Sequence, residues 1–175
     1  MLGFGFTEGS ANDWLAITMV DGYGTSETVG AIALGLFVTV MTLSRLVGGA
    51  ALERWGRVAV LRITAVSALV GLLLVVSGWS VWLVMAGIVC WGAGASLGFP
   101  VGMSAAADDP VRAAVRVSVA SSIGYAAFLA GPPLIGFLSV RVGPLNALLV
   151  LLVALAVGLA ATGAARPLPE SVSAH

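Results

Sequence analysis

Long apolar runs separated by short polar stretches make up most of this chain. A membrane-spanning helix needs about 20 predominantly apolar residues, and six segments reach roughly that length. We predict helices over residues 2–20, 28–52, 58–77, 81–105, 115–140 and 144–163. The connections are short, so consecutive helices are expected to be antiparallel neighbours. The expected fold is an all-α membrane protein with six transmembrane helices within residues 1–166, followed by a short tail over 167–175.

Composition narrows the class of protein. Of the 175 residues, 59% are hydrophobic and 9% are charged, whereas a soluble domain has about 25% charged residues. The formal net charge is zero, so no nucleic-acid partner is expected. One cysteine and one histidine make a zinc or iron site built on those side chains unexpected, and we predict neither a metal nor another cofactor.

Arginine placement predicts which way the helices cross the membrane. Cytoplasmic connections carry an excess of basic residues. The connections after the second and fourth predicted helices, with the tail, hold Arg54, Arg57, Arg62, Arg112, Arg116 and Arg166. The opposite side holds only Arg141, beside the acidic Asp21 and Glu27. This asymmetry predicts a cell-membrane protein with both termini in the cytoplasm.

The densest charge cluster lies between the second and third predicted helices. It reads G-x-x-x-E-R-x-G-R and consists of Gly49, Glu53, Arg54, Gly56 and Arg57. Glycines there permit a tight turn, the arginines anchor it at one membrane face, and the Glu53 carboxylate is available to offset their charge.

This cluster resembles the loop signature of the major facilitator superfamily, with Glu53 where aspartate is commoner. In that family the signature occurs between helices two and three and, in weaker form, between helices eight and nine. The resemblance implies that Arg45, Glu53, Arg54 and Arg57 help to hold a closed state on the cytoplasmic side. A plain basic membrane anchor is the alternative, and Arg45 itself either snorkels or pairs with a carboxylate.

The first predicted helix carries the unusual polar residues. A carboxylate at mid-membrane is costly and tends to face the protein interior or a wet cavity. Glu8 and Asn12 are four residues apart and share a helix face, whereas Asp13 lies on another side of the helix. We predict a substrate or proton site on Glu8 and Asn12, with Asp13 as a further candidate; a solvated acidic helix end is the alternative. The pattern E-G-x-x-x-D-W also resembles the seventh helix of fucose-permease-like members of the family.

Glycine and proline mark the fourth and fifth predicted helices. Gly94, Gly98 and Gly102 repeat every fourth residue, so they share a face that another helix can approach closely. Pro100 frees a backbone carbonyl and is expected to kink the helix; a moving helix and static packing both fit this composition.

The fifth predicted helix contains the run Gly131-Pro132-Pro133, which we expect to break the regularity of that helix. G-P-P-x-x-G resembles the eleventh helix of facilitator proteins. Tyr125 is either a cavity-lining residue or a packed tyrosine with a satisfied hydroxyl.

The resemblance covers essentially the whole chain, as six helices matching helices seven to twelve of a facilitator. It implies secondary transport of a small solute, with proton coupling through Glu8 or Asp13 as a hypothesis. The fucose-permease-like pattern favours sugars, while drugs and other metabolites stay open. The partners would be the lipid bilayer, the solute, protons, and either an N-terminal half missing from this fragment or a second copy of it.

Two other functions stay open. One is a non-transporting interaction or regulatory membrane protein. The other is an integral-membrane enzyme, for which the best available residues are Asp108 and Asp109 near Arg112 and Arg116.

Overall fold

The described part of the protein consists of helices and their connections. A computed structural model describes residues 1–166, and this part contains no β-strand. The elements in chain order are α1 (Leu2–Ile17), η1 (Thr18–Gly22), α2 (Glu27–Ser77), α3 (Val81–Ala95), α4 (Gly98–Ala106), α5 (Ala113–Val142), α6 (Pro144–Ala147), α7 (Leu149–Ala160) and η2 (Ala161–Ala165). The all-α prediction is confirmed for these residues, whereas the expected tail over 167–175 lies outside them.

Four helical segments within residues 1–166 are long and apolar enough to cross a membrane. They are Glu27–Ser77, Val81–Ala106, Ala113–Val142 and Pro144–Ala165. α1, which is 16 residues long, is shorter than these and is not among them. The lengths and composition support a membrane protein that crosses the bilayer several times.

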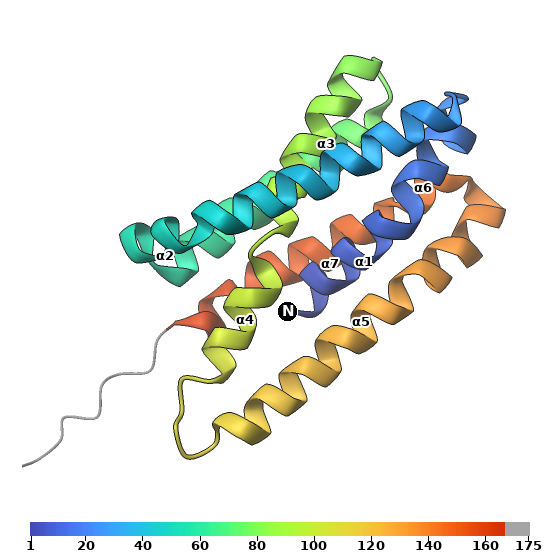
Figure 1. The fold of residues 1–175 in the computed structure, drawn as a ribbon. Helices are drawn as coiled ribbons and strands as arrows, with labels where there is room; N and C mark the ends of the chain where they lie inside the picture. Colours follow the sequence, from blue (N-terminus) through green and yellow to red (C-terminus); the bar gives the residue numbers. More distant parts are fainter. Residues whose placement is uncertain (167–175) are drawn as a thin grey trace, which may run out of the picture.

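α2 is divided by one residue of the arginine-rich cluster. Gly56 has φ 75° and ψ 161°, whereas the flanking residues are helical. We call residues 27–55 the first limb of α2 and residues 57–77 its second limb. Figure 1 shows the chain folding back at this point, so that the two limbs run in opposite directions. The two helices expected over 28–52 and 58–77 correspond to these limbs.

The helix expected over 81–105 is interrupted one turn before Pro100. α3 ends at Ala95 and α4 begins at Gly98, because the proline ring has no N–H for the carbonyl four residues earlier and crowds it. This interruption divides the expected glycine face. A Cβ on Gly94 would lie 2.5 Å from the Thr64 carbonyl oxygen of the second limb, but one on Gly98 would meet the Phe4 side chain of α1. The repeated glycines therefore do not form one seam with one partner helix.

α5 differs from the sequence-based expectation at its prolines. We expected Pro132 and Pro133 to break the helix, but α5 runs without interruption from Ala113 to Val142. The fixed φ of proline is compatible with a helix. What a proline removes is the hydrogen bond to the carbonyl group four residues earlier, because proline has no N–H. The carbonyl of Phe128, four residues before Pro132, lies against Gly9 of α1, where a Cβ would be only 2.6 Å from its oxygen.

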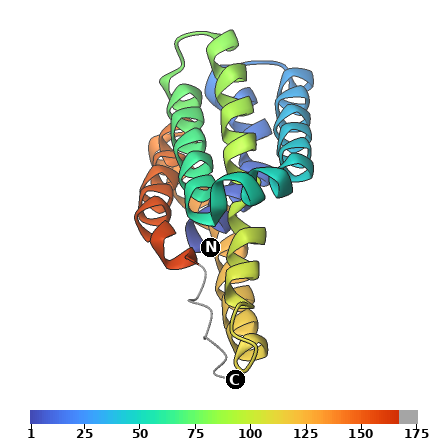
Figure 2. The same ribbon diagram turned by 90° about the vertical axis from the view of Figure 1, so that its left-hand side faces the viewer.

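α1 lies at the centre of the arrangement. It contacts α2, α3, α4, α5 and α7, and Figure 1 shows it between α2 and α5. α3 lies between the two limbs of α2 (Figure 2). The Trp91 ring of α3 is fully buried and meets the Phe37 ring of the first limb edge to face, with centroids 5.4 Å apart. Gly71 and Gly87 let α3 approach the second limb backbone to backbone.

Candidate functional site

An ion pair joins α1 to the first limb of α2. The Arg45 Nη2 donates to the Glu8 Oε1 over 2.7 Å. The Glu8 side chain is 13% exposed and that of Arg45 is 37% exposed. Glu8 is therefore not a solvated helix end, and Arg45 pairs with a carboxylate rather than only reaching toward the membrane surface.

Arg45 also holds the interruption between α3 and α4. Its Nε donates to the backbone carbonyl of Ser96 over 2.9 Å. In a regular helix that carbonyl would accept from the N–H of residue 100, but Pro100 has none. The Ser96 hydroxyl itself donates to the carbonyl of Ala93. One guanidinium thus connects α1, α2 and the interrupted helix.

The other polar residues of α1 are placed differently. The Asn12 side-chain amide donates to the backbone carbonyl of Glu8 over 3.1 Å, not to its carboxylate. Asp13 is exposed and forms no ion pair with the residues described here. The structure therefore places Asn12 one turn along from the Glu8–Arg45 pair, while Asp13 stands apart from it.

Tyr125 lies on the outer surface of α5. Its side chain is 61% exposed, and its ring packs at a tilt against that of Phe99 on α4, with centroids 5.8 Å apart. Its hydroxyl forms no hydrogen bond to the protein within residues 1–166. Tyr125 is therefore not a buried tyrosine with a satisfied hydroxyl.

The arginine-rich cluster is tied to the turn between α4 and α5. Arg57 forms an ion pair with Asp108 at 2.5 Å and donates to the Ser104 hydroxyl over 3.1 Å. Arg116 lies 3.9 Å from Asp109. Both aspartates of the turn therefore face arginines, and the two ion pairs tie this turn to the limb junction of α2 and to the start of α5.

The remaining residues of the cluster lie at the surface. Gly49, Glu53 and Arg54 are exposed, and the Arg54 guanidinium is 5.9 Å from the Trp55 ring centroid. The carboxylate that neutralises Arg57 comes from Asp108, whereas we had considered Glu53 for that role.

Glycine-lined contacts bring α1 and α5 together. A Cβ on Gly5 would lie 3.1 Å from the carbonyl oxygen of Gly124, and one on Gly131 would lie 2.6 Å from the Ser10 hydroxyl. Further along, the Trp14 indole N–H donates to the carbonyl of Pro132 over 2.9 Å. Sequence reasoning missed this seam; small residues four apart at Gly5 and Gly9 were the available signal.

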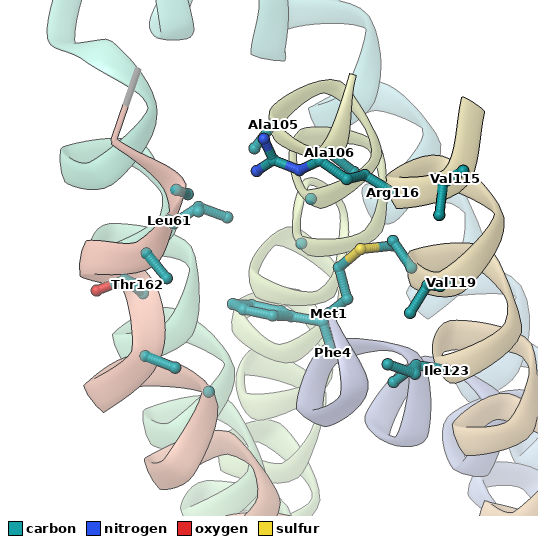
Figure 3. A pocket seen from close by; sticks show the side chains of 17 residues that line it. Met1, Phe4, Leu61, Ala105, Ala106, Val115, Arg116, Val119, Ile123 and Thr162 are labelled. Carbon is teal, nitrogen blue, oxygen red and sulfur yellow. The ribbon is translucent and has the colours of Figure 1, made fainter. Parts of the chain in front are cut away.

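A cavity of about 500 Å³ lies near the start of α1, between α1, α4, α5 and the end of α7. In Figure 3 the side chains of Met1, just before α1, and of Phe4 in α1 border it, and those of Val119 and Ile123 border it from α5. Its lining is largely apolar, apart from Arg116 and Thr162. None of Glu8, Asn12, Asp13 or Tyr125 lines it, so the expected site and this cavity are separate.

Comparison with known proteins identifies relatives over most of the chain. The family model of the Major Facilitator Superfamily matches residues 2–175. An uncharacterised transporter of Sinorhizobium fredii is 37% identical over 79% of this chain and 37% of its own length. An uncharacterised MFS-type transporter of Yersinia pestis is 35% identical over 75% of this chain and 35% of its own length.

No solved structure matches the chain. The chain spans little more than a third of the length of the curated relatives it matches. The family match over nearly every residue agrees with the helical architecture and with the arginine-rich cluster at Gly49–Arg57. This chain is a member of the Major Facilitator Superfamily.

Proposed function

We propose that this chain forms six membrane-spanning helices and is one half of a secondary transporter for a small solute. The six helices are α1 with η1, the two limbs of α2, α3 with α4, α5, and α6 with α7. The observation that supports this function most directly is the Glu8–Arg45 ion pair between neighbouring helices. Ionisable side chains are costly at membrane depth and characteristically mark pathways for solutes or protons.

The other half would come from an N-terminal six-helix segment or from a second copy of this chain. Transporters of this architecture bind solute at mid-membrane between two halves. Support comes from the curated relatives, which extend well beyond the matched region. On this proposal the 175-residue chain by itself does not transport.

The Arg57–Asp108 clasp fits the cytoplasmic face. Most of the arginines predicted to face the cytoplasm belong to the junction of the two limbs and to the α4–α5 turn, and basic residues favour that side of a membrane. On this orientation both termini are cytoplasmic, and the clasp joins the limb junction of α2 to the α4–α5 turn at the cytoplasmic face.

Glu8 is the proposed proton-coupling residue, with Asp13 as the second candidate. A carboxylate paired with an arginine can exchange that partner for a proton, which changes the contact between two helices. Asn12 and Tyr125 remain candidates for contact with the solute. The substrate would be small and uncharged or singly charged, because the pair offers one charge of each sign.

Uptake by reconstituted protein tests the proposal. The full-length transporter would be placed in liposomes with an alkaline interior, and accumulation of radiolabelled sugars, amino acids and small carboxylates would be measured. We expect one class to accumulate, and the Glu8→Gln variant to lose accumulation while retaining exchange of solute across the membrane. Comparison with Asp13→Asn identifies which carboxylate couples solute accumulation to the pH gradient.

The alternative of a regulatory membrane protein predicts no uptake of any class. Correctly folded protein that moves none of these solutes, with or without a pH gradient, would contradict the transporter proposal. Uptake by the isolated 175-residue monomer would contradict the requirement for a second half.

A further inference from the structure

The Arg45 side chain is partly exposed, and some of its N–H groups form no hydrogen bond within residues 1–166. A guanidinium carries five N–H groups. In the described structure Arg45 uses its Nε for the Ser96 carbonyl and its Nη2 for Glu8. Its Nη1 has no hydrogen-bond partner within residues 1–166, and the side chain is 37% exposed. The guanidinium is therefore accessible while it remains held at two points.

The bond to Ser96 fixes how those spare donors are presented. Because the Nε side of the guanidinium is occupied by the carbonyl that Pro100 leaves without a helical donor, the edge formed by Nη1 and Nη2 is left for other partners. Two N–H groups on one edge of a guanidinium match the two oxygens of a carboxylate. One of these positions is taken by Glu8 Oε1.

The charge balance around this edge depends on one carboxylate. α2, α3, α4, α5 and α7 all pack against α1. Among the described residues they bring one charged side chain within 4 Å of the Glu8 carboxylate, and that side chain is Arg45. The other acidic residue of α1, Asp13, is exposed and unpaired in residues 1–166. A proton on Glu8 would remove the one carboxylate paired with Arg45, and the accessible guanidinium would then be free to pair with an anion from solution.

We infer that Arg45 is the binding point for a singly charged anionic solute, a small carboxylate, and that this carboxylate competes with Glu8. The inference rests on the proposed transport function and names its substrate class. A proton from solution neutralises Glu8, the Glu8–Arg45 contact opens, and the carboxylate of the solute occupies the Nη1–Nη2 edge. Proton and anion then enter together, and the net charge of the site is the same before and after.

Propionate and propionamide provide a matched pair of probes that differ in charge and little in shape. Binding to the purified protein in detergent would be followed by thermal-shift titration at pH 7.5. At pH 7.5 we expect the Glu8→Gln variant to bind propionate about tenfold more tightly than the wild type, in the range typical of coupling between two ligands. Propionamide should bind no more tightly to the variant than to the wild type.

Two further variants control for charge and folding. Glu27→Gln removes an exposed carboxylate at the start of α2 and should leave propionate binding unchanged. Arg45→Gln should abolish propionate binding; should it fail to fold, the double variant Glu8→Gln with Arg45→Gln removes both charges together and should bind no propionate.

Equal affinity of Glu8→Gln and wild type for propionate would overturn the inference, as would propionate binding that survives the loss of Arg45. Accumulation of a neutral sugar by the reconstituted wild type, together with either result, would leave the transport function standing while the carboxylate assignment falls. Absence of uptake for every solute class would instead remove the transport function.

Discussion

The backbone at Gly56 lies where only glycine is found without strain. With φ 75° and ψ 161°, any side chain there costs about 1–3 kcal/mol. We expect Gly56→Ala to lower the stability of the purified protein by about that amount, measured by thermal unfolding in detergent.

Gly49 of the same cluster provides the control for that measurement. It is helical and exposed, and a Cβ there would meet nothing within 4 Å. Gly49→Ala should be neutral or stabilising, by up to about 1 kcal/mol. Equal losses in both variants would show that the strain at Gly56 is not the cause.

Tyr23, in the connection between η1 and α2, is expected to make the stability of the protein depend on pH in the alkaline range. Its hydroxyl donates to the carbonyl of Val75, and burial raises the pKa of Tyr23 above its ordinary value, with a smaller opposing effect from the Gly78 backbone. The folded protein therefore favours the neutral phenol. Its stabilising contribution is complete below pH about 10, where the unfolded chain titrates, and it is lost as the pH rises through the folded pKa.

Replacing Tyr23 by phenylalanine should thus cost about 1 kcal/mol near neutral pH and flatten the fall in stability above pH 10. Thermal unfolding in detergent between pH 8 and pH 11 measures both effects. Tyr125→Phe is the control, because the Tyr125 hydroxyl has no hydrogen-bond partner within the described residues. An unchanged alkaline slope in Tyr23→Phe would contradict the assignment.

At the scale of the helices, the contact between α1 and α5 depends on the absence of a side chain at Gly9. A Cβ there would lie 2.6 Å from the carbonyl oxygen of Phe128, and backbone atoms cannot move aside cheaply. Gly9→Ala should lower stability by about 1–3 kcal/mol. Gly35→Ala, on an exposed stretch of α2 with nothing within 4 Å of its Cβ, should cause no loss; a harmless Gly9→Ala would mean that the two helices are not in close contact.

The presence of helices could be predicted from the sequence more reliably than the positions at which they are interrupted. Apolar runs predicted an all-α chain, which residues 1–166 confirm, and Pro100 indicated an interruption close to the one found at Ser96–Leu97. The same reasoning failed at Pro132 and Pro133, where α5 continues. The two proline sites differ in their tertiary contacts. Arg45 supplies a donor to the carbonyl that Pro100 leaves free, and close packing on Gly9 covers the one left by Pro132.

At the scale of the whole molecule, the candidate site is an assembly of parts that no local pattern brings together. Glu8 was recognisable as an unusual carboxylate in an apolar helix, and Arg45 as an arginine in need of a partner. Their pairing depends on how α1 packs against the first limb of α2, which periodicity does not specify. The Arg57–Asp108 clasp has the same origin, since its two residues are 51 positions apart and meet only when the interrupted helix returns to the limb junction.

The proposed six-helix topology makes a prediction that the four long helical segments alone do not. If α2 crosses the membrane twice, with its reversal at Gly56, then positions 27 and 79 lie on one side and positions 53 and 111 lie on the other. Glu27, Glu53, Trp79 and Val111 are all exposed, and Cys90 is the only native cysteine. Single cysteines at these four positions, in a Cys90→Ser background, therefore report the topology directly.

We expect a membrane-impermeant maleimide added to intact cells to label Glu27→Cys and Trp79→Cys, because these positions face outward in the proposed orientation. Glu53→Cys and Val111→Cys should be labelled only after the membrane is permeabilised, since they lie beside the arginines that favour the cytoplasm. Labelling of positions 27 and 79 from opposite sides would mean that α2 crosses once, which would contradict the six-helix half. The reverse pattern for all four positions would keep the six helices and invert their orientation, placing the Arg57–Asp108 clasp outside the cell.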